Sequence, residues 1–224
     1  MAKRKLQRFA ENETFPHFFQ PDWNELQAGF TLKGNWNKAF FKNNNPLIIE
    51  MGCGKGEYVV DLSEKYPQKN FIGIDKKGAR MWVGAKRSFE EKRANVAFLR
   101  MQAESLPDVF GENEVDEIWI TFPEPQPNSP RTMKRFTSPR YLARFAKILK
   151  PEGIIHLKTD NDMFYEYTLE VIREGGHKLL LSFPDLYADA GNPLVKDVMG
   201  VQTHYEKIWL AQGLTIKYLQ FKLG

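Results

Sequence analysis

The residues best placed to do chemistry lie in and after a glycine-rich turn. An apolar run over 47–51 contains a single acid, Glu50, and the turn Gly-Cys-Gly-Lys-Gly follows it directly at 52–56. Glycines let the backbone of such a turn approach a ligand closely, and the helix expected over 57–66 points its first N–H groups toward that ligand. The sequence therefore predicts a ligand site at this turn, the alternative being a turn that is only structural.

The spacing of the glycines narrows the class of ligand. A dinucleotide-binding turn follows G-x-G-x-x-G, whereas here the third glycine is Gly56 and Glu57 occupies the next position. A phosphate-binding P-loop fails as well, because no Gly-Lys-Ser or Gly-Lys-Thr stands at the required spacing. What remains is E-x-G-x-G-x-G, the form found in methyltransferases that bind S-adenosylmethionine. That ligand carries an ammonium and a sulfonium group, so the acid Glu50 suits its charge.

Three more polar residues follow predicted strands at the same edge. Asp75 ends the second predicted strand, where a carboxylate can accept hydrogen bonds from ribose hydroxyls. Gln102 follows the third strand, and its carboxamide can both donate to and accept from the edge of adenine. Glu124 follows the fourth strand in a proline-rich loop, and prolines hold such a loop stiff. Asp75 could instead be a solvated acid at a strand end, Gln102 an ordinary loop glutamine, and the proline-rich loop around Glu124 merely structural.

Strands and helices alternate along the chain, which is the pattern of a doubly wound α/β fold. We predict a mostly parallel, seven-stranded, Rossmann-like sheet over residues 46–224, preceded by a basic and aromatic arm over 1–45. In such sheets ligands lie beyond the carboxyl ends of the strands. Strands are expected at 47–51, 71–75, 96–99, 115–122, 153–159, 177–183 and 214–223, and helices at 57–66, 77–93, 138–150, 162–174 and 203–212.

The composition is that of one globular domain with a mildly basic surface. The 224 residues are 42% hydrophobic, and a formal net charge of +4 with a pI near 9.0 permits a polyanionic partner. The single cysteine, Cys53, excludes an intrachain disulfide and suits a reducing compartment. The sequence has neither a secretory signal pattern nor an apolar run of about 20 residues, so we expect a cytoplasmic protein without a membrane span.

A cluster of basic residues follows the proline-rich loop. Arg131, Lys134 and Arg135 are expected beside the pocket, where they could contact RNA phosphates. A solvated basic face is the alternative. No spacing of histidine, cysteine, aspartate and glutamate in the sequence suits a metal ion, so we expect no metal site.

Together these motifs resemble those of the bacterial tRNA (guanine-N7)-methyltransferases. The likeness covers residues 46–224 and includes the glycine motif at 49–56, Phe-Pro-Glu-Pro at 122–125, Lys-Thr-Asp-Asn at 158–161 and Thr-His-Tyr-Glu at 203–206. The last motif is the most specific. The resemblance implies a class I methyltransferase fold, S-adenosylmethionine as the methyl donor, and N7 of guanine 46 in the variable loop of tRNA as the acceptor.

The resemblance also implies roles for individual residues. Cofactor contacts would come from Glu50, Gly52, Gly54, Asp75, Gln102 and Glu124, and Glu124 would also be the catalytic residue. The target guanosine would be bound by Asn128, Asp160, Thr203, His204, Tyr205 and Glu206. The family normally has aspartate where this chain has Glu124 and lysine where it has Asn128, so the loop departs from the pattern.

Two alternatives to an active tRNA methyltransferase remain. The altered loop would fit a protein that binds cofactor or RNA without transferring a methyl group. A small-molecule methyltransferase would use the cofactor residues but leave the basic cluster and the 203–206 motif without a role. If the first interpretation holds, the partner is tRNA, and the protein is a monomer or a homodimer.

Overall fold

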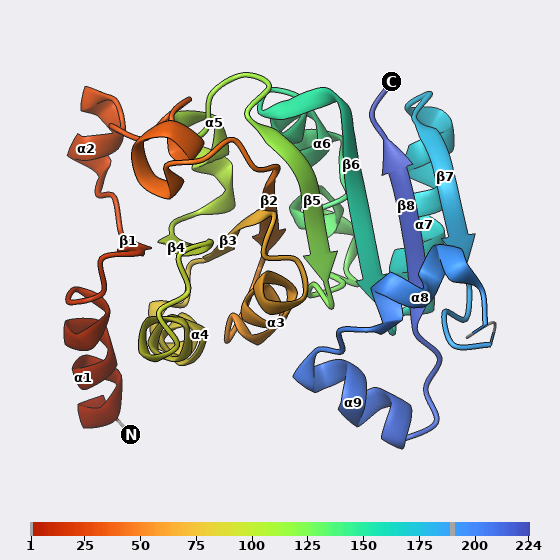
Figure 1. The fold of residues 1–224 in the computed structure, drawn as a ribbon. Coiled ribbons are helices and arrows are strands. Elements are labelled where there is room, and N and C mark those ends of the chain that lie inside the picture. Colours follow the sequence, from red (N-terminus) through yellow and green to blue (C-terminus); the bar gives the residue numbers. More distant parts are fainter. Residues whose placement is uncertain (1, 189–190) are drawn as a thin grey trace.

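An open eight-stranded sheet runs through the computed structural model, which describes residues 2–188 and 191–224. The strand order is β1-β4-β3-β2-β5-β6-β8-β7, and β8 runs antiparallel to both of its neighbours (Figure 1). The strands are β1 (Phe18–Phe19), β2 (Leu47–Met51), β3 (Asn70–Asp75), β4 (Val96–Arg100), β5 (Val115–Thr121), β6 (Leu149–Thr159), β7 (Lys178–Phe183) and β8 (Lys217–Lys222).

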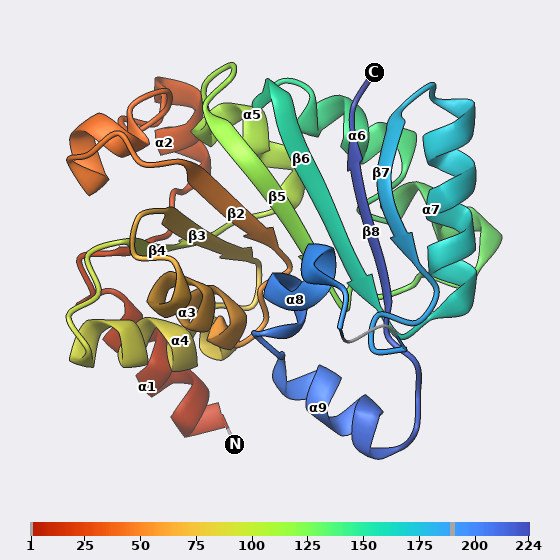
Figure 2. The same ribbon diagram turned by 45° about the vertical axis from the view of Figure 1, so that its right-hand side comes forward.

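Helices cover both faces of this sheet (Figure 1, Figure 2). The α-helices are α1 (Ala2–Asn12), α2 (Trp23–Ala28), α3 (Glu57–Lys65), α4 (Gly78–Glu90), α5 (Leu106–Val109), α6 (Pro139–Phe145), α7 (Asp162–Glu174), α8 (Pro193–Met199) and α9 (His204–Ala211). Shorter turns are the π-helical η1 (Trp36–Phe41) and the 3₁₀ turns η2 (Ala103–Ser105) and η3 (Ser129–Lys134). Helices α5, α6 and α7 contribute to one apolar cluster, and α3, α4 and α8 contribute to a second.

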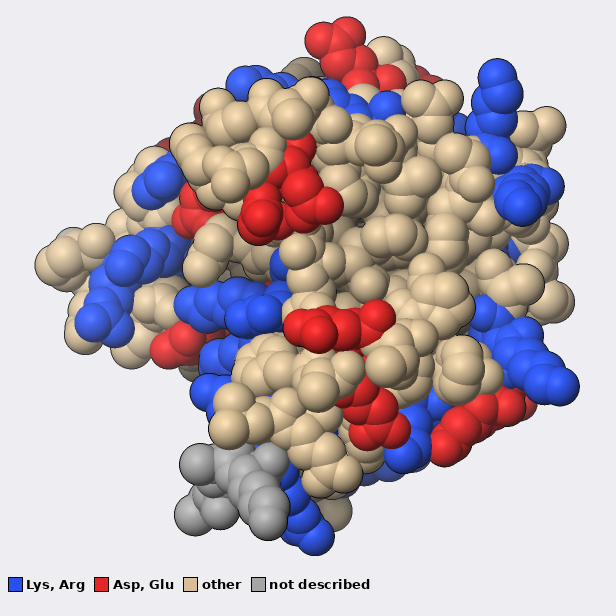
Figure 3. Space-filling view, turned by 90° about the vertical axis from the view of Figure 1, so that its left-hand side faces the viewer, with Lys and Arg blue, Asp and Glu red and all other residues tan. Residues whose placement is uncertain are grey.

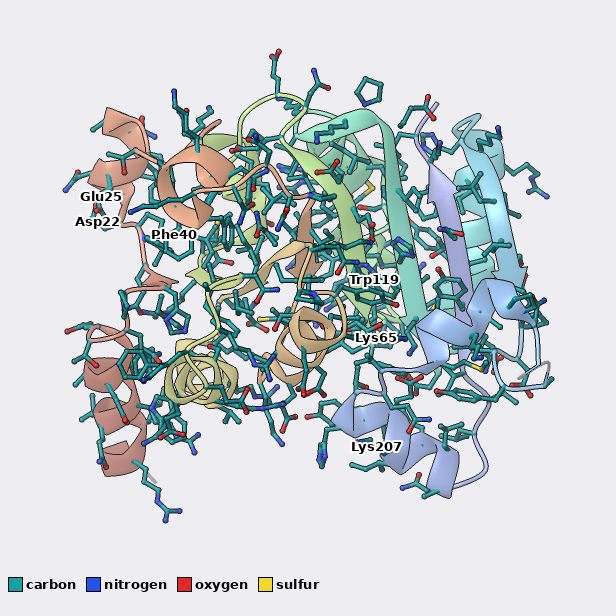
Figure 4. The ribbon with its side chains drawn as sticks, viewed as in Figure 1. Asp22, Glu25, Phe40, Lys65, Trp119 and Lys207 are labelled. Carbon is teal, nitrogen blue, oxygen red and sulfur yellow. The ribbon has the colours of Figure 1, made fainter. Side chains whose placement is uncertain are left out.

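Side chains of β2 alternate between these two clusters, as the pleat of a strand requires. Leu47 and Ile49 pack in the first cluster, and Ile48 packs in the second. Trp119 on β5 faces the second cluster and stacks on His156, with ring centroids 4.0 Å apart (Figure 4). Because β2 is buried on both faces, its sequence is a continuous apolar run rather than an alternating one.

The parallel strands bring their carboxyl ends to one edge of the sheet. In the register of β2, Glu50 lies opposite Gly73 of β3 on one side and Trp119 of β5 on the other. The pairing of β5 with β6 extends to Thr121 opposite Lys158. Residues that follow these strands in sequence are therefore neighbours in space, and ligands of open α/β sheets bind at this edge.

The segment before β2 packs onto the rest of the domain. Trp36 is fully buried, and its Nε1 donates to the carbonyl oxygen of Val109 at 2.9 Å. Helix α1 packs against α4, where the Asn12 side chain donates to the carbonyl of Gly78 at 2.9 Å (Figure 1). Asp22 and Glu25 form a reciprocal capping box at the start of α2 (Figure 4).

The predicted class, a doubly wound and mostly parallel α/β sheet, is confirmed, whereas the predicted count of seven strands is wrong. The additional strand β1 pairs with β4 through only two residues, which is too short to leave a pattern in the sequence. The helix expected over 138–150 ends at Phe145, because Leu149 already pairs with Val115 and begins β6. Helices α1, α2, α5 and α8 were not among the predicted elements.

Candidate cofactor and substrate site

A cavity of about 720 Å³ opens at the carboxyl edge of the sheet, bordered by the ends of β2, β3 and β5 and the start of α9. Most of the predicted site residues line it: Glu50, Gly52, Gly54, Asp75, Gln102, Glu124, Lys134, Asp160, Thr203, His204 and Tyr205. Four others, Asn128, Arg131, Arg135 and Glu206, do not line it. The structure thus brings together residues that are up to 155 positions apart in the sequence, from Glu50 to Tyr205.

The glycine turn forms one wall of the cavity and needs glycine for two reasons. Gly54 has φ of 57°, and a Cβ on it would meet no atom closer than 4.0 Å, so its bare α-carbon leaves room for a ligand. Gly56 has φ of 71°, and a Cβ there would lie 2.3 Å from the ring of Phe98. The first glycine opens the cavity, and the second lets the turn pack against the sheet.

Asp75 lies at the end of β3 and fastens the turn. Its Oδ2 accepts from the backbone N–H of Gly54 at 3.0 Å, and its Oδ1 accepts from that of Lys77 at 2.8 Å. Each carboxylate oxygen has two lone pairs, so both keep acceptor capacity for a ligand. Gln102, which is exposed at the start of η2, lines the cavity beyond the next strand.

Glu50 is a buried acid, only 3% exposed, with one oxygen lacking a partner. The Thr121 hydroxyl donates to its Oε1, while Oε2 accepts no hydrogen bond from any residue that the structure describes. Burial raises the pKa of Glu50 to about 7, and the charge of Asp75 adds to this, although the Thr121 hydrogen bond opposes it. A cationic group beside Oε2 would satisfy that oxygen and favour the ionised carboxylate.

Glu124 is exposed in the loop after β5, which has two residues with left-handed backbone. Phe122 has φ of 46° and Gln126 has φ of 47°, and each of them precedes a proline. Such φ values are uncommon for residues with large side chains and indicate a conformation that the surroundings impose. The loop carries Glu124 at the wall of the cavity, facing the same space as the glycine turn.

Arg135 holds this loop from inside the protein, whereas the sequence predicts that it contacts RNA phosphates. Its side chain is only 5% exposed, its Nε donates to the carbonyl of Pro125 at 3.0 Å, and its Nη2 donates to that of Gln126 at 3.0 Å. The guanidinium also lies 4.2 Å from the ring centroid of Tyr167. Nothing in the local sequence separates Arg135 from its exposed neighbour Lys134, which lines the cavity.

The 203–206 motif forms the first turn of α9. Its first three residues line the cavity, and its last residue, Glu206, is buried in the protein. Thr203 and Glu206 make a reciprocal capping box, which starts the helix at the cavity. His204 and Tyr205 line the cavity, and the Tyr205 side chain is 46% exposed. The motif therefore presents an aromatic ring to any ligand that enters between α9 and the glycine turn.

Glu206 itself is fully buried, and the predicted direct contact with a guanine base is not supported. Its carboxylate pairs with the Lys158 ammonium at 2.6 Å and accepts from the Tyr187 hydroxyl at 2.7 Å, as well as from the backbone N–H of Thr203. Burial lowers the pKa of Lys158, while the pairing with Glu206 opposes that shift. The contacts of Glu206 anchor the start of α9 on the end of β6.

Asp160 follows β6 and lines the cavity on the side of α9. It is half-buried, and its backbone carbonyl accepts from the Lys217 ammonium at 3.0 Å. The next residue, Asn161, caps α7 by accepting from the backbone N–H of Phe164 at 2.8 Å. A strand end and a capped helix start thus position Asp160.

Basic residues that the sequence analysis did not single out lie at the start of α4. Lys76, Lys77 and Arg80 are exposed and line the cavity. The sequence did give a signal, because two lysines follow Asp75 directly. Beside them Arg8 of α1 lies 4.4 Å from the ring centroid of Trp82 on α4. Lysine and arginine side chains are spread over the left, lower and right parts of the face shown in Figure 3, with aspartate and glutamate side chains between them.

Among residues 2–188 and 191–224, no helix combines the length and apolarity needed to cross a membrane. Within the same residues, no group of three or more histidine, cysteine, aspartate or glutamate side chains is arranged to hold a metal ion.

Comparison with solved structures defines the fold class as that of class I methyltransferases. The 16S rRNA methyltransferase KamB superposes with a TM-score of 0.62 at 16% identity, over 84% of this chain and 92% of that one. A 30S ribosomal A1408 methyltransferase from an uncultured bacterium gives a TM-score of 0.60 at 18% identity, over 91% and 95% of the two chains. At these identities the likeness concerns the fold alone.

Comparison with curated sequences identifies the family. A family model described as "Putative methyltransferase" matches residues 44–219. The tRNA (guanine-N(7)-)-methyltransferase of Christiangramia forsetii is 49% identical, with 99% of each chain covered, and that of Bacteroides fragilis is 45% identical, over 100% of this chain and 87% of the other. The chain belongs to the bacterial tRNA (guanine-N7)-methyltransferase family, which confirms the resemblance found in the sequence.

Proposed function

We propose that this protein transfers a methyl group from S-adenosylmethionine to N7 of a guanine in tRNA, and that the target is guanine 46 in the variable loop. The observation that carries the proposal is the cavity, which Glu50, Asp75 and the glycine turn line together with Glu124 and the first turn of α9. The part formed by Glu50, Asp75 and the glycine turn, called the cofactor wall below, suits a nucleoside cofactor, and the remaining part suits a base. Membership of the family supports the same assignment.

The cofactor wall fits S-adenosylmethionine residue by residue. The unpartnered, buried Oε2 of Glu50 suits the ammonium group of the cofactor, and the free lone pairs of Asp75 suit its ribose hydroxyls. Gln102, which lines the cavity, would read the adenine edge, and Gly54 would leave space for the chain that joins the two ends. When bound, the cofactor supplies an electrophilic methyl group.

The acceptor needs charge stabilisation rather than a strong base. Guanine N7 has a lone pair and no proton, so methylation at N7 leaves a positive charge on the purine. The Glu124 and Asp160 carboxylates line the cavity and would stabilise that charge as it develops. Holding donor and acceptor in line would supply the remaining rate enhancement, on the order of 7–11 kcal/mol for well-oriented reactants.

The geometry of RNA requires that the target base be accessible. In an A-form helix N7 faces a deep, narrow groove that side chains cannot read, so the guanine must lie in a loop or be splayed out. Tyr205 offers an exposed ring on which such a base could stack. Lys76, Lys77 and Arg80 at the rim, with Lys134 across the cavity, would take the neighbouring phosphates. A tRNA substrate places the reaction in the cytoplasm.

Nucleoside analysis tests the proposal. Unmodified tRNA is incubated with the protein and methyl-labelled S-adenosylmethionine, and its digest is separated by chromatography. We expect label in 7-methylguanosine, and Glu124→Gln serves as the control for chemistry in the cavity. Label in another nucleoside, or in none, would contradict the proposed reaction.

The altered loop favours one second candidate, a homologue that binds tRNA and cofactor with little or no methyl transfer. Glutamate and asparagine stand at 124 and 128, where the resemblance to the family implies aspartate and lysine. This candidate predicts salt-dependent retention of tRNA on a filter without formation of 7-methylguanosine.

A further inference from the structure

The loop over 122–128, which carries Glu124, adopts a backbone conformation that its own residues disfavour. Phe122 and Gln126 have left-handed φ values of 46° and 47°, and each is followed by proline. A proline restricts the residue before it to extended conformations, and a bulky residue rarely takes a positive φ. Contacts from outside the loop must therefore stabilise this shape, because strained residues persist only where their surroundings over-determine them.

Arg135 supplies those contacts on the far side of Glu124. Its Nε and Nη2 each donate at 3.0 Å, to the carbonyls of Pro125 and Gln126 respectively. The left-handed turn at Gln126 brings these two successive carbonyls to one guanidinium. The near side of the loop is held by the backbone N–H of Phe122, which donates to the carbonyl of Lys158 at 2.8 Å.

The environment of Arg135 fixes its guanidinium in turn. The side chain is 5% exposed, and the guanidinium lies 4.2 Å from the ring centroid of Tyr167 on α7. A planar guanidinium can donate two parallel hydrogen bonds while its face stacks on an aromatic ring, whereas a lysine ammonium is a point charge that lacks both the planar fork of donors and the flat face. Arginine and lysine are therefore not equivalent at position 135.

We propose that Arg135 is a positioning residue for methyl transfer: it clamps the strained loop so that the Glu124 carboxylate stays at the cavity. The inference rests on the proposed function for its kinetic part, because Glu124 matters only if a cation develops in the cavity. Lys134 and Arg135 then have separate tasks. The first faces the cavity, and the second faces inward to the loop that borders it.

A double-mutant cycle tests this assignment in the intact protein. Arg135→Lys should lower kcat by at least tenfold, with KM for tRNA and the Kd of S-adenosylhomocysteine changed by less than threefold. If Arg135 acts through Glu124, Arg135→Lys combined with Glu124→Gln should be no slower than Glu124→Gln alone. The assignment would be overturned if the fold-losses in kcat of the two single variants multiplied in the double variant. It would also be overturned if Arg135→Lys raised KM without lowering kcat.

Arg144→Lys is the matched control. Arg144 also lies over a tyrosine ring, at 5.6 Å from the centroid of Tyr141, and donates to the single carbonyl of Arg140, but it lies at the surface and outside the cavity lining. The kcat of Arg144→Lys should match that of the wild type. If replacing any arginine in this region lowers activity, the kcat of Arg135→Lys and of Arg144→Lys would fall equally, which would contradict a specific role of Arg135.

Amide hydrogen exchange at Phe122 separates this inference from the proposed function, because its N–H is protected by the Lys158 carbonyl at 2.8 Å. Arg135→Lys should speed exchange of this amide by at least tenfold, and Arg144→Lys should leave it unchanged, whether or not tRNA is methylated. Faster exchange in a protein that forms no 7-methylguanosine would refute the reaction and leave the clamp standing. Unchanged exchange in Arg135→Lys would refute the clamp.

Discussion

Glu50 combines two properties that the proposed cofactor makes compatible. The acid is buried, with a pKa raised to about 7, and its Oε2 lacks a hydrogen-bond partner among the described residues. Without a ligand this arrangement destabilises the protein above neutral pH, where the carboxylate is ionised. A cation at Oε2 removes that cost by pairing with the carboxylate. The site should therefore prefer a cationic ligand to a neutral one.

The first prediction concerns the pH dependence of stability in the ligand-free protein. The pKa of Glu50 is about 7 in the folded protein and 4.5 in the unfolded chain. The protonated acid therefore contributes its full share of folding stability below about pH 4.5, and this contribution is lost as the pH rises to about 7. We expect the free energy of unfolding of Glu50→Gln to exceed that of the wild type at pH 8 by up to roughly 3 kcal/mol. The free energies of unfolding of the two proteins should converge near pH 4.5, and urea titrations at both pH values measure them.

The same substitution should weaken cofactor binding. Glu50→Gln removes the charge that faces the ammonium group, so the Kd of S-adenosylhomocysteine at pH 8 should rise by about tenfold or more, since charged hydrogen bonds contribute about 1.5–3 kcal/mol. In the wild type, affinity should fall as pH drops below about 7, because the protonated acid no longer attracts a cation. Calorimetry at several pH values measures both effects; unchanged affinity would place the ammonium elsewhere.

Glu124 gives a prediction about chemistry rather than binding. Glu124→Gln keeps the size of the side chain and removes its charge, so we expect kcat to fall by about 100-fold, the scale seen when one stabilising group is lost. The Kd of S-adenosylhomocysteine should change little. Glu124→Asp, which restores the family residue, should retain activity. A Gln variant with normal kcat would show that the charge at 124 is not used.

At the scale of elements, α9 depends on a buried ion pair. Lys158 and Glu206 are both fully buried and pair at 2.6 Å, so replacing one leaves the other charge uncompensated. Lys158→Met should cost about 3–5 kcal/mol of folding free energy, and Lys158→Met with Glu206→Leu should recover part of it. Urea unfolding of the three proteins checks this. A double variant less stable than the single one would refute the interpretation.

Helix α1 and the start of α4 form the basic element that should take RNA phosphates. Arg4 and Lys5 are exposed on α1, and Lys76 and Lys77 are exposed before α4. Arg4→Ala with Lys5→Ala should weaken tRNA binding and lower the slope of log K against log salt by about one unit per phosphate contact. Lys178→Ala on β7, at the opposite edge of the sheet, is the control (Figure 1). Equal losses of tRNA affinity in the α1 variant and in Lys178→Ala would contradict an RNA-binding surface confined to α1 and the start of α4.

At the scale of the whole molecule, the sequence was most informative where local chemistry dictates structure. The β2 strand, the glycine turn and Asp75 were predictable, because burial on both faces and positive φ values restrict which residues can stand there. The cavity could be predicted as well, since parallel strands deliver their ends to one edge.

Features that depend on distant contacts could not be predicted. Helix α1 is mostly polar, with Leu6 and Phe9 as its large apolar side chains, and it docks through side-chain contacts such as Asn12 with Gly78 and Arg8 with Trp82. Arg135 and Glu206 belong to motifs whose other members face the cavity, and their inward direction depends on Tyr167 and Lys158, far away in the sequence. Spacing identifies which residues act together but not which way each one points.

Methyl transfer to N7 of guanine 46, as proposed above, is tested most directly by an atomic substitution in the substrate. A tRNA assembled with 7-deazaguanosine at position 46 keeps the shape and pairing of guanosine but lacks N7. Beside the same tRNA with guanosine 46, we expect full incorporation of labelled methyl into the normal substrate and none into the deaza form. Equal incorporation into both would contradict transfer to N7 of this guanine.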